Sequence, residues 1–247
     1  MHYIVFDLEF NQDIPSLREP EPNRTRYPFE IIQIGAVKLD ASFQTISTFN
    51  RYVKPTIYEE ISSFVTELTG ITAQKLSTEV LFPEVFHSFI KFINDAESIY
   101  CVWGMADLKE LYRNAEYHNL DIKKLPKRFI NLQPYASLHF GYPSSKLLQL
   151  KNTVTSLNIP TPYEFHSAYH DAYYTAEILK KIYKPSISPS VYDPNYIKLK
   201  ARKQKKEIDY PALLKQFEKM YNRSMTEEEQ SIIITAYKMG RTQQFLK

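Results

Sequence analysis

The sequence predicts an α/β domain built on a mixed five-stranded sheet flanked by helices, with a small helical appendage at its C-terminal end. Three observations lead to this fold class. The apolar runs 3–10, 30–39 and 48–53 follow one another without a helix between them, which predicts an antiparallel meander. The later runs 98–103 and 129–132 alternate with helical periodicity, which favours parallel pairing through crossover helices. A length of 247 residues with 43% hydrophobic content is sufficient for one well-buried domain.

The first predicted strand carries two acids in an otherwise apolar run. Because alternate residues of a strand share a face, Asp7 and Glu9 project together, about 7 Å apart. Two buried carboxylates repel each other and lose hydration, unless one of them stays protonated or a cation lies between them. Mg²⁺ and Mn²⁺ prefer carboxylate oxygens, so this strand predicts a divalent-metal site. The alternative is an edge strand whose acidic face is exposed to water.

Helices are predicted between and after the strands from turn residues and apolar periodicity. Gly70 ends one helix, and Thr72 caps the next. Pro83 opens a helix with an apolar stripe, and another helix follows the fourth strand. A further helix is expected to begin at Ser144, and the last helix of the domain to cover residues 167–182. The residues expected to face the core from the middle three helices are Val85, Phe86, Phe89, Ile90, Ile93, Leu108, Leu111, Tyr112, Ala115, Leu147, Leu150, Val154 and Leu157.

The domain is expected to cover residues 1–184, and residues 185–247 to form a linker, a basic segment and two helices. Residues 185–197 contain three prolines and three serines, which is typical of a linker. Six of the nine residues 198–206 are basic, and residues 185–247 carry 12 lysine and arginine against 7 aspartate and glutamate residues. This uneven charge favours a protein or nucleic-acid contact through the C-terminal segment, with a solvated helix face as the alternative.

The remaining composition bears on location and on one long loop. The single cysteine, Cys101, lies in an apolar run, which favours an inert buried thiol and a reducing compartment. The acids of the first strand interrupt the N-terminal apolar stretch, so neither a signal peptide nor a membrane span is expected, and the predicted location is the cytoplasm. Residues 11–29 contain four prolines and are expected to form a loop that carries Arg18, Arg24 and Arg26.

Three further residues with chemical potential lie beside the later strands. Asp107 follows the fourth strand at the first turn of a helix, where capping or helix-dipole stabilisation is a sufficient explanation. Asp171 lies early in the 167–182 helix among alanines that predict close packing on the sheet, an unfavourable place for an unpaired carboxylate. His166 precedes that helix. A histidine side chain can take a proton from water near neutral pH, although a lone histidine is more often structural.

Taken together, these residues resemble a known family signature. In order and type, Asp7-x-Glu9, Asp107 and His166-x4-Asp171 are similar to the four acids and histidine of the DEDDh 3′–5′ exonucleases, which have a ribonuclease H-like fold. The segments EIIQIGAV, LTGIT and HSAYHDA also resemble the family, over roughly residues 1–183. The WGxxD segment that ends at Asp107 and the strand 129–132 look most like the Eri-type and KapD-like branch.

The resemblance implies a role for each residue of the signature. Asp7, Glu9 and Asp171 would hold the first of two Mg²⁺ or Mn²⁺ ions, with Asp7 bridging to the second and Asp107 contributing through water. His166 would be the general base. The family often has aspartate where this chain has His170, so two histidines compete for that role, and the spacing favours His166. Leu8 and Phe10 flank the acids and, with His166, are the expected contacts to the terminal nucleotide.

The implied activity is the metal-dependent hydrolysis of phosphodiester bonds at the 3′ ends of RNA or single-stranded DNA, with release of nucleoside 5′-monophosphates. Two alternatives stay open from the sequence. One is a proofreading or repair exonuclease subunit that docks on a polymerase. The other is a catalytically idle nucleic-acid-binding module of the same fold, against which the complete set of acids argues.

Overall fold

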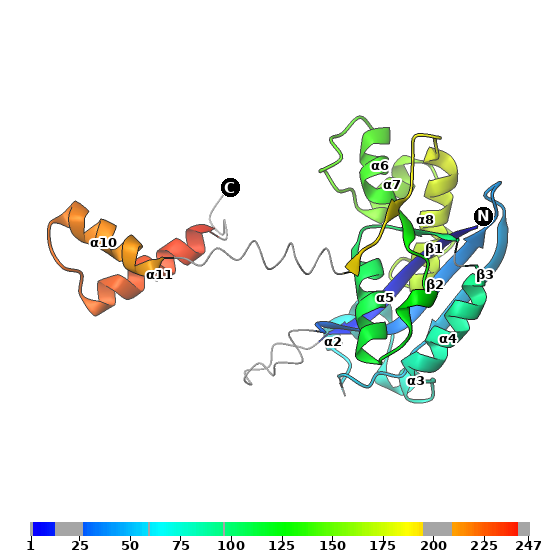
Figure 1. Cartoon of the computed structure of the whole chain (residues 1–247), viewed down its shortest axis with the longest axis horizontal. Helices are drawn as coiled ribbons and strands as arrows, with labels where there is room; N and C mark the ends of the chain where they lie inside the picture. Colours follow the sequence, from blue (N-terminus) through cyan, green and yellow to red (C-terminus); the bar gives the residue numbers. More distant parts are fainter. Residues whose placement is uncertain (1, 13–26, 59, 96, 195–208, 242–247) are drawn as a thin grey trace. The chain divides into compact units, whose positions relative to one another are not determined.

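The computed structural model describes residues 2–12, 27–58, 60–95, 97–194 and 209–241 (Figure 1). The chain divides into two compact units, Met1–Pro194 and Asn195–Lys247, and each is described by itself. The arginines predicted for the 11–29 loop and the basic segment 198–206 lie outside the described residues.

The first unit contains a six-stranded mixed sheet in the order β3-β2-β1-β4-β5-β6. The predicted meander is formed by β1 (Tyr3–Gln12), β2 (Phe29–Leu39) and β3 (Thr45–Tyr52). The strands β4 (Ile99–Val102) and β5 (Arg128–Asn131) continue the sheet in parallel from β1. β1 therefore lies inside the sheet, as predicted. Because β4 pairs with residues 3–5 of β1, the carboxyl end of β1 extends beyond that pairing and carries the two acids.

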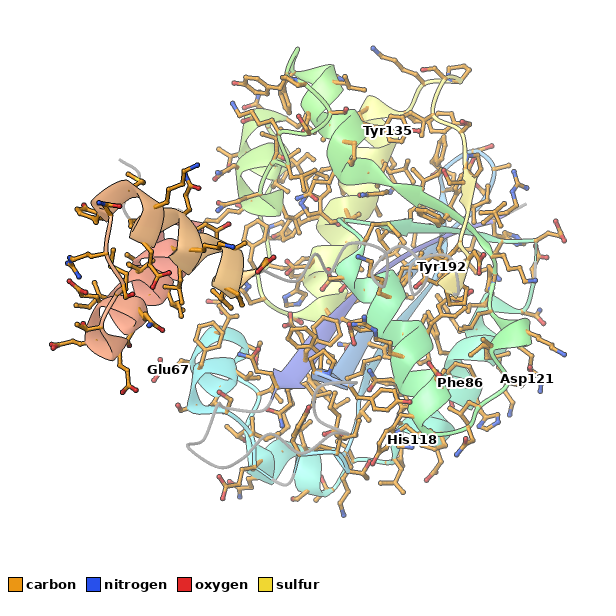
Figure 2. The ribbon with its side chains drawn as sticks, turned by 60° about the vertical axis from the view of Figure 1, so that its left-hand side comes forward. Glu67, Phe86, His118, Asp121, Tyr135 and Tyr192 are labelled. Atoms are coloured by element: carbon orange, nitrogen blue, oxygen red, sulfur yellow. The ribbon has the colours of Figure 1, made fainter. Side chains whose placement is uncertain are left out.

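The prediction of five strands is wrong by one. The two-residue strand β6 (Ser190–Val191) pairs antiparallel with β5, and the Tyr192 amide donates to the carbonyl of Lys127 at 2.8 Å. The Tyr192 ring packs beside α5 (Figure 2), with 4.7 Å between its centroid and that of Tyr112. Residues 185–194, predicted as linker, thus belong to the first unit. A strand this short has no readable periodicity, and contacts with distant residues hold it in place.

Helices cover both faces of the sheet. On one face α8 (Ala168–Ile182) lies with α6 (Leu132–His139) and α7 (Leu150–Ser156) (Figure 1). The other face is covered by α4 (Phe82–Ile93) and α5 (Ala106–Tyr117). Val5 of β1 belongs to the core beneath α8, whereas the Phe6 ring lies 6.1 Å from that of Phe89 on α4. Asp7 and Glu9 lie on the same face of β1 as Val5, which is the face covered by α8.

Two short helices confirm the predicted turn chemistry before α4. α2 (Ser63–Thr69) ends at Gly70, which has a left-handed φ of 69°. α3 (Ala73–Ser77) begins after Thr72, whose side chain accepts a hydrogen bond from the Lys75 amide at 3.2 Å. The short 3₁₀ helix η1 (Ile122–Lys124) follows α5.

The helix predicted to begin at Ser144 is wrong at its start. α7 begins at Leu150, and Leu147 is 59% exposed rather than in the core. Side chains of α6 bind the carbonyls of the preceding segment: Gln133 donates to Leu148 at 2.8 Å, and Ser137 donates to Lys146. These carbonyls are therefore used in a turn and not in a helix. The helix α6 was not predicted, because its first residue, Leu132, directly follows Asn131, the last residue of β5.

The second unit contains α10 (Tyr210–Tyr221) and α11 (Glu227–Arg241). A capping box starts α11: the Thr226 amide donates to Glu229 at 2.9 Å, and the Glu229 amide donates to Thr226 at 3.3 Å. Met220 of α10 is 66% exposed, so this pair of helices leaves apolar surface uncovered within the described residues. None of the helices in the described part of the chain has the length and apolar content needed to cross a bilayer.

Candidate active site

The four predicted acids come from three elements that meet at the carboxyl end of β1. Asp7 and Glu9 lie on β1, Asp107 in the first turn of α5 and Asp171 in the first turn of α8. One carboxylate oxygen from each of Asp7, Glu9 and Asp171 lies within 4.8 Å of the others. Asp107 is close enough for its charge to raise the pKa of Asp7. The structure thus brings together four residues that are up to 164 positions apart in the chain.

A glycine on β2 allows α8 to reach these acids. Gly35 lies directly opposite Asp7 in the antiparallel pair. A Cβ at this position would lie 2.0 Å from the Tyr169 amide nitrogen and 2.1 Å from the carbonyl carbon of Ala168. The first turn of α8 therefore rests on the backbone of β2, with Asp171 beside the β1 acids. Any side chain larger than hydrogen would push this turn away from the sheet.

The four carboxyls make an electrostatically unfavourable group without a cation. Burial, with repulsion from Asp171 and Asp107, raises the pKa of Glu9 to about 8. Burial raises the pKa of Asp107 to about 7, although a backbone hydrogen bond from Leu8 opposes the rise. Burial likewise raises the pKa of Asp171 to about 6, and burial together with the other three acids holds the pKa of Asp7 well above its usual range. Such shifts cluster at functional sites and are reversed by a bound cation.

The donor atoms fit a hard divalent cation. Asp171 accepts a hydrogen bond through Oδ2 from the His166 amide at 3.1 Å. Its other oxygen, Oδ1, is buried without a hydrogen-bond partner among the described residues. A buried oxygen of this kind needs an explanation, and an ion shared with Asp7 and Glu9 provides one. The DEDDh resemblance also implies a divalent metal, and Asp7, Glu9 and Asp171 would hold it.

The two histidines of the α8 entry have different surroundings. His166 has a left-handed φ of 66° and is exposed, and its backbone amide is its contact with the acid cluster. The His170 ring stacks on Tyr163, with 4.8 Å between centroids, and its Nδ1 lies 3.0 Å from the carbonyl oxygen of Glu164. His170 therefore braces the loop that carries His166.

The two apolar residues that flank the β1 acids are packed in the fold. Leu8 is 3% exposed and lies on the opposite face of β1 from the acids, so its link to the site is the backbone hydrogen bond to Asp107. The Phe10 ring packs on Phe29, with 5.6 Å between centroids. Nucleotide contacts by Leu8 and Phe10 stay a prediction.

Two buried amides of the site were missed in the sequence. Asn114 ties α5 to the start of β2: it accepts from the Ile31 amide at 3.0 Å and donates to the carbonyl of Phe29 at 3.1 Å. Gln33 ties the start of α8 to β2. A glutamine between apolar residues of a buried strand is a signal that could have revealed Gln33. Asn114, on the face of a polar helix, offers no such signal.

The mixed sheet flanked by helices has the ribonuclease H-like fold that the sequence predicted, and the acids gather at the end of its central strand. The RNase_T exonuclease family model matches residues 4–179, and the chain belongs to this exonuclease family. Its relatives include exonucleases of the Eri type, as the sequence predicted.

Several relatives and solved structures are similar to this chain. ERI1 exoribonuclease 3 from Bos taurus and from Homo sapiens is 27% identical over 172 residues, which is 66% of this chain and 48% of each relative. The chain thus spans about half the length of these curated relatives. The nuclease domain of 3′hExo, a DEDDh family member bound to rAMP, has a TM-score of 0.64 at 22% identity, over 78% of this chain and 96% of that one. E. coli exonuclease I in complex with a dT13 oligonucleotide has a TM-score of 0.58 at 15% identity, over 73% of this chain and 40% of that chain.

Proposed function

We propose that this protein is a metal-dependent 3′–5′ exonuclease that releases nucleoside 5′-monophosphates. The observation that carries the proposal is the cluster of Asp7, Glu9 and Asp171, with ligand oxygens within 4.8 Å and one buried oxygen without a partner. Membership of the exonuclease family and the similarity to 3′hExo support it. RNA is the proposed substrate, because ERI1 exoribonuclease 3 and 3′-5′ exoribonuclease 1 are among the similar curated proteins, and single-stranded DNA is the second choice.

The residues of the site have the following proposed roles. Asp7, Glu9 and Asp171 would hold one Mg²⁺ or Mn²⁺ ion, and Asp7 and Asp107 would help to hold a second. The ions, when bound, supply activation of a water and stabilisation of the attacking and leaving oxygens of the phosphodiester. His166 takes the proton from the attacking water, and its exposed position at the cluster edge suits a side chain that must meet substrate.

The proposed activity is tested with 5′-labelled single-stranded RNA and DNA of one sequence, each in Mg²⁺, Mn²⁺ or EDTA. The expected result is a ladder that shortens from the 3′ end, faster on RNA, and that stops in EDTA. Circular single strands, which have no 3′ end, should stay intact. No ladder on any linear substrate, or cleavage of the circles, contradicts the proposal.

Replacement of the two histidines is expected to separate their roles. His166→Ala should lower kcat by about 10²- to 10⁴-fold, since this is the usual contribution of general acid–base catalysis. His170→Ala removes a loop contact and leaves the base in place, so its effect on kcat should be much smaller. Initial rates at saturating substrate and Mn²⁺ measure kcat for both variants. Full activity in His166→Ala would show that another group takes the proton.

The C-terminal segment is proposed to add a nucleic-acid contact outside the catalytic unit. Its support is the sequence of residues 198–206, six of which are basic. Replacement of these six by glutamine should weaken RNA binding and flatten its salt dependence, because fewer phosphates are neutralised, while kcat on short oligomers stays the same. An unchanged salt slope would instead favour a protein partner for the apolar surface of α10 and α11.

The cytoplasm is the proposed location. Cys101 is fully buried and burial raises the pKa of its thiol, so this cysteine suits a reducing compartment and takes no part in the chemistry.

A further inference from the structure

We propose that Gln33 is a positioning residue that fixes the start of α8, and with it Asp171 and His166, against the acids of β1. The inference rests on the proposed function, since it concerns the same metal site. Gln33 lies on β2, an element that supplies none of the four acids.

The carboxamide of Gln33 links three elements of the fold. Its Oε1 accepts a hydrogen bond from the Ala168 amide at 3.2 Å. Its Nε2 donates to Asn50 Oδ1 on β3 at 2.9 Å and lies 3.4 Å from Ser167 Oγ. With 0% exposure, the side chain is held in one place and has no surface available to a substrate. Any effect of Gln33 on the reaction must therefore act through the residues that it contacts.

The start of α8 depends on this external contact. The first amides of a helix have no partner within the helix and are normally bound by the side chain of the N-cap residue. Ser167 is the N-cap of α8 but makes no such side-chain hydrogen bond. Gln33 instead provides an acceptor for the first of these amides, that of Ala168, and so ties the start of α8 to the neighbouring strand β2.

This contact lies beside the acids. In the β1–β2 pair Gln33 is opposite Glu9, and Gly35, on which Ala168 rests, is opposite Asp7. Asp171 follows Ala168 by one helical turn, and its carboxylate binds the amide of His166. A displacement of Ala168 therefore changes the separation of Asp171 from Asp7 and Glu9, and it moves His166 as well.

The test is Mn²⁺ binding to the full-length chain by isothermal titration calorimetry, without substrate. Gln33→Met keeps the length of the side chain but removes its acceptor, and it should lower Mn²⁺ affinity by about 10- to 100-fold, as loss of a supporting contact does in other metal sites. Gln33→Asn, one methylene shorter and still polar, replaces Gln33→Met if that variant does not fold.

A matched control separates positioning from general stability. Leu76→Ala opens the small core cluster of Ile32, Val65, Ile71 and Leu76, so it lowers the melting temperature but should leave Mn²⁺ affinity unchanged. Wild-type affinity in folded Gln33→Met or Gln33→Asn would overturn this inference alone. Absence of Mn²⁺ binding by the wild type would overturn the proposed function and this inference with it.

Discussion

Asp7→Asn is expected to lower exonuclease activity by at least about 10³-fold and, in the absence of metal, to raise the melting temperature. Asp7 lies between the other three acids, so loss of its charge removes a shared metal ligand and several kcal/mol of transition-state stabilisation. The same change removes a carboxyl that is unfavourable in the metal-free fold. Single-turnover rates in Mn²⁺ measure the loss of activity. Thermal unfolding of the same preparation in EDTA measures the change in melting temperature.

Asp121→Asn is the matched control for this prediction. Asp121 caps η1 by accepting from the Lys123 amide, and asparagine is an equally good cap. This variant should match the wild type in both measurements. An active Asp7→Asn enzyme would contradict the assignment of the site, and a lower melting temperature in EDTA would contradict the electrostatic account of it.

The free energy of unfolding of the metal-free protein is expected to fall as the pH rises from about 4.5 to 8. Burial raises the pKa of Asp171 to about 6, of Asp107 to about 7 and of Glu9 to about 8. These carboxyls keep their protons in the folded state at pH values where the unfolded chain has lost them. The folded state then binds more protons, so stability decreases as the pH rises through this window. A difference of one pKa unit between the folded and unfolded states changes the free energy of unfolding by about 1.4 kcal/mol.

Mn²⁺ should reverse this trend, because it binds the ionised carboxylates of the folded state. Urea unfolding at pH 5, 6, 7 and 8, in EDTA and in Mn²⁺, measures both curves, and the stabilisation by Mn²⁺ should be largest at pH 8. Asp7→Asn, which has one acid fewer, should show a shallower fall in EDTA. A metal-free stability that rises steadily over this range would contradict the raised pKa values.

The sequence was most informative where local chemistry decides the structure. Asp7 and Glu9 stand out because acids are costly in an apolar strand, and Gly70 and Thr72 mark helix ends by their own backbone and side-chain preferences. These features need no distant partner. The family resemblance then connected the β1 acids with Asp107, His166 and Asp171.

What could not be predicted depends on contacts between distant residues. The hydrogen bond from Ala168 to Gln33 joins residues 135 positions apart, and only the folded chain shows it. The start of α7 is set by Gln133, which takes the Leu148 carbonyl out of the expected helix. The strand β6 exists because Tyr192 packs on α5 and its amide binds the carbonyl of Lys127, just before β5. In each case tertiary contacts outweigh the local pattern.

The most direct test of the metal centre is anomalous diffraction from crystals of the full-length protein soaked in Mn²⁺. The predicted result is a strong anomalous peak among the carboxylates of Asp7, Glu9 and Asp171, with a second peak between Asp7 and Asp107. A map with no peak at these four carboxylates, at a Mn²⁺ concentration that supports maximal activity, would contradict the account.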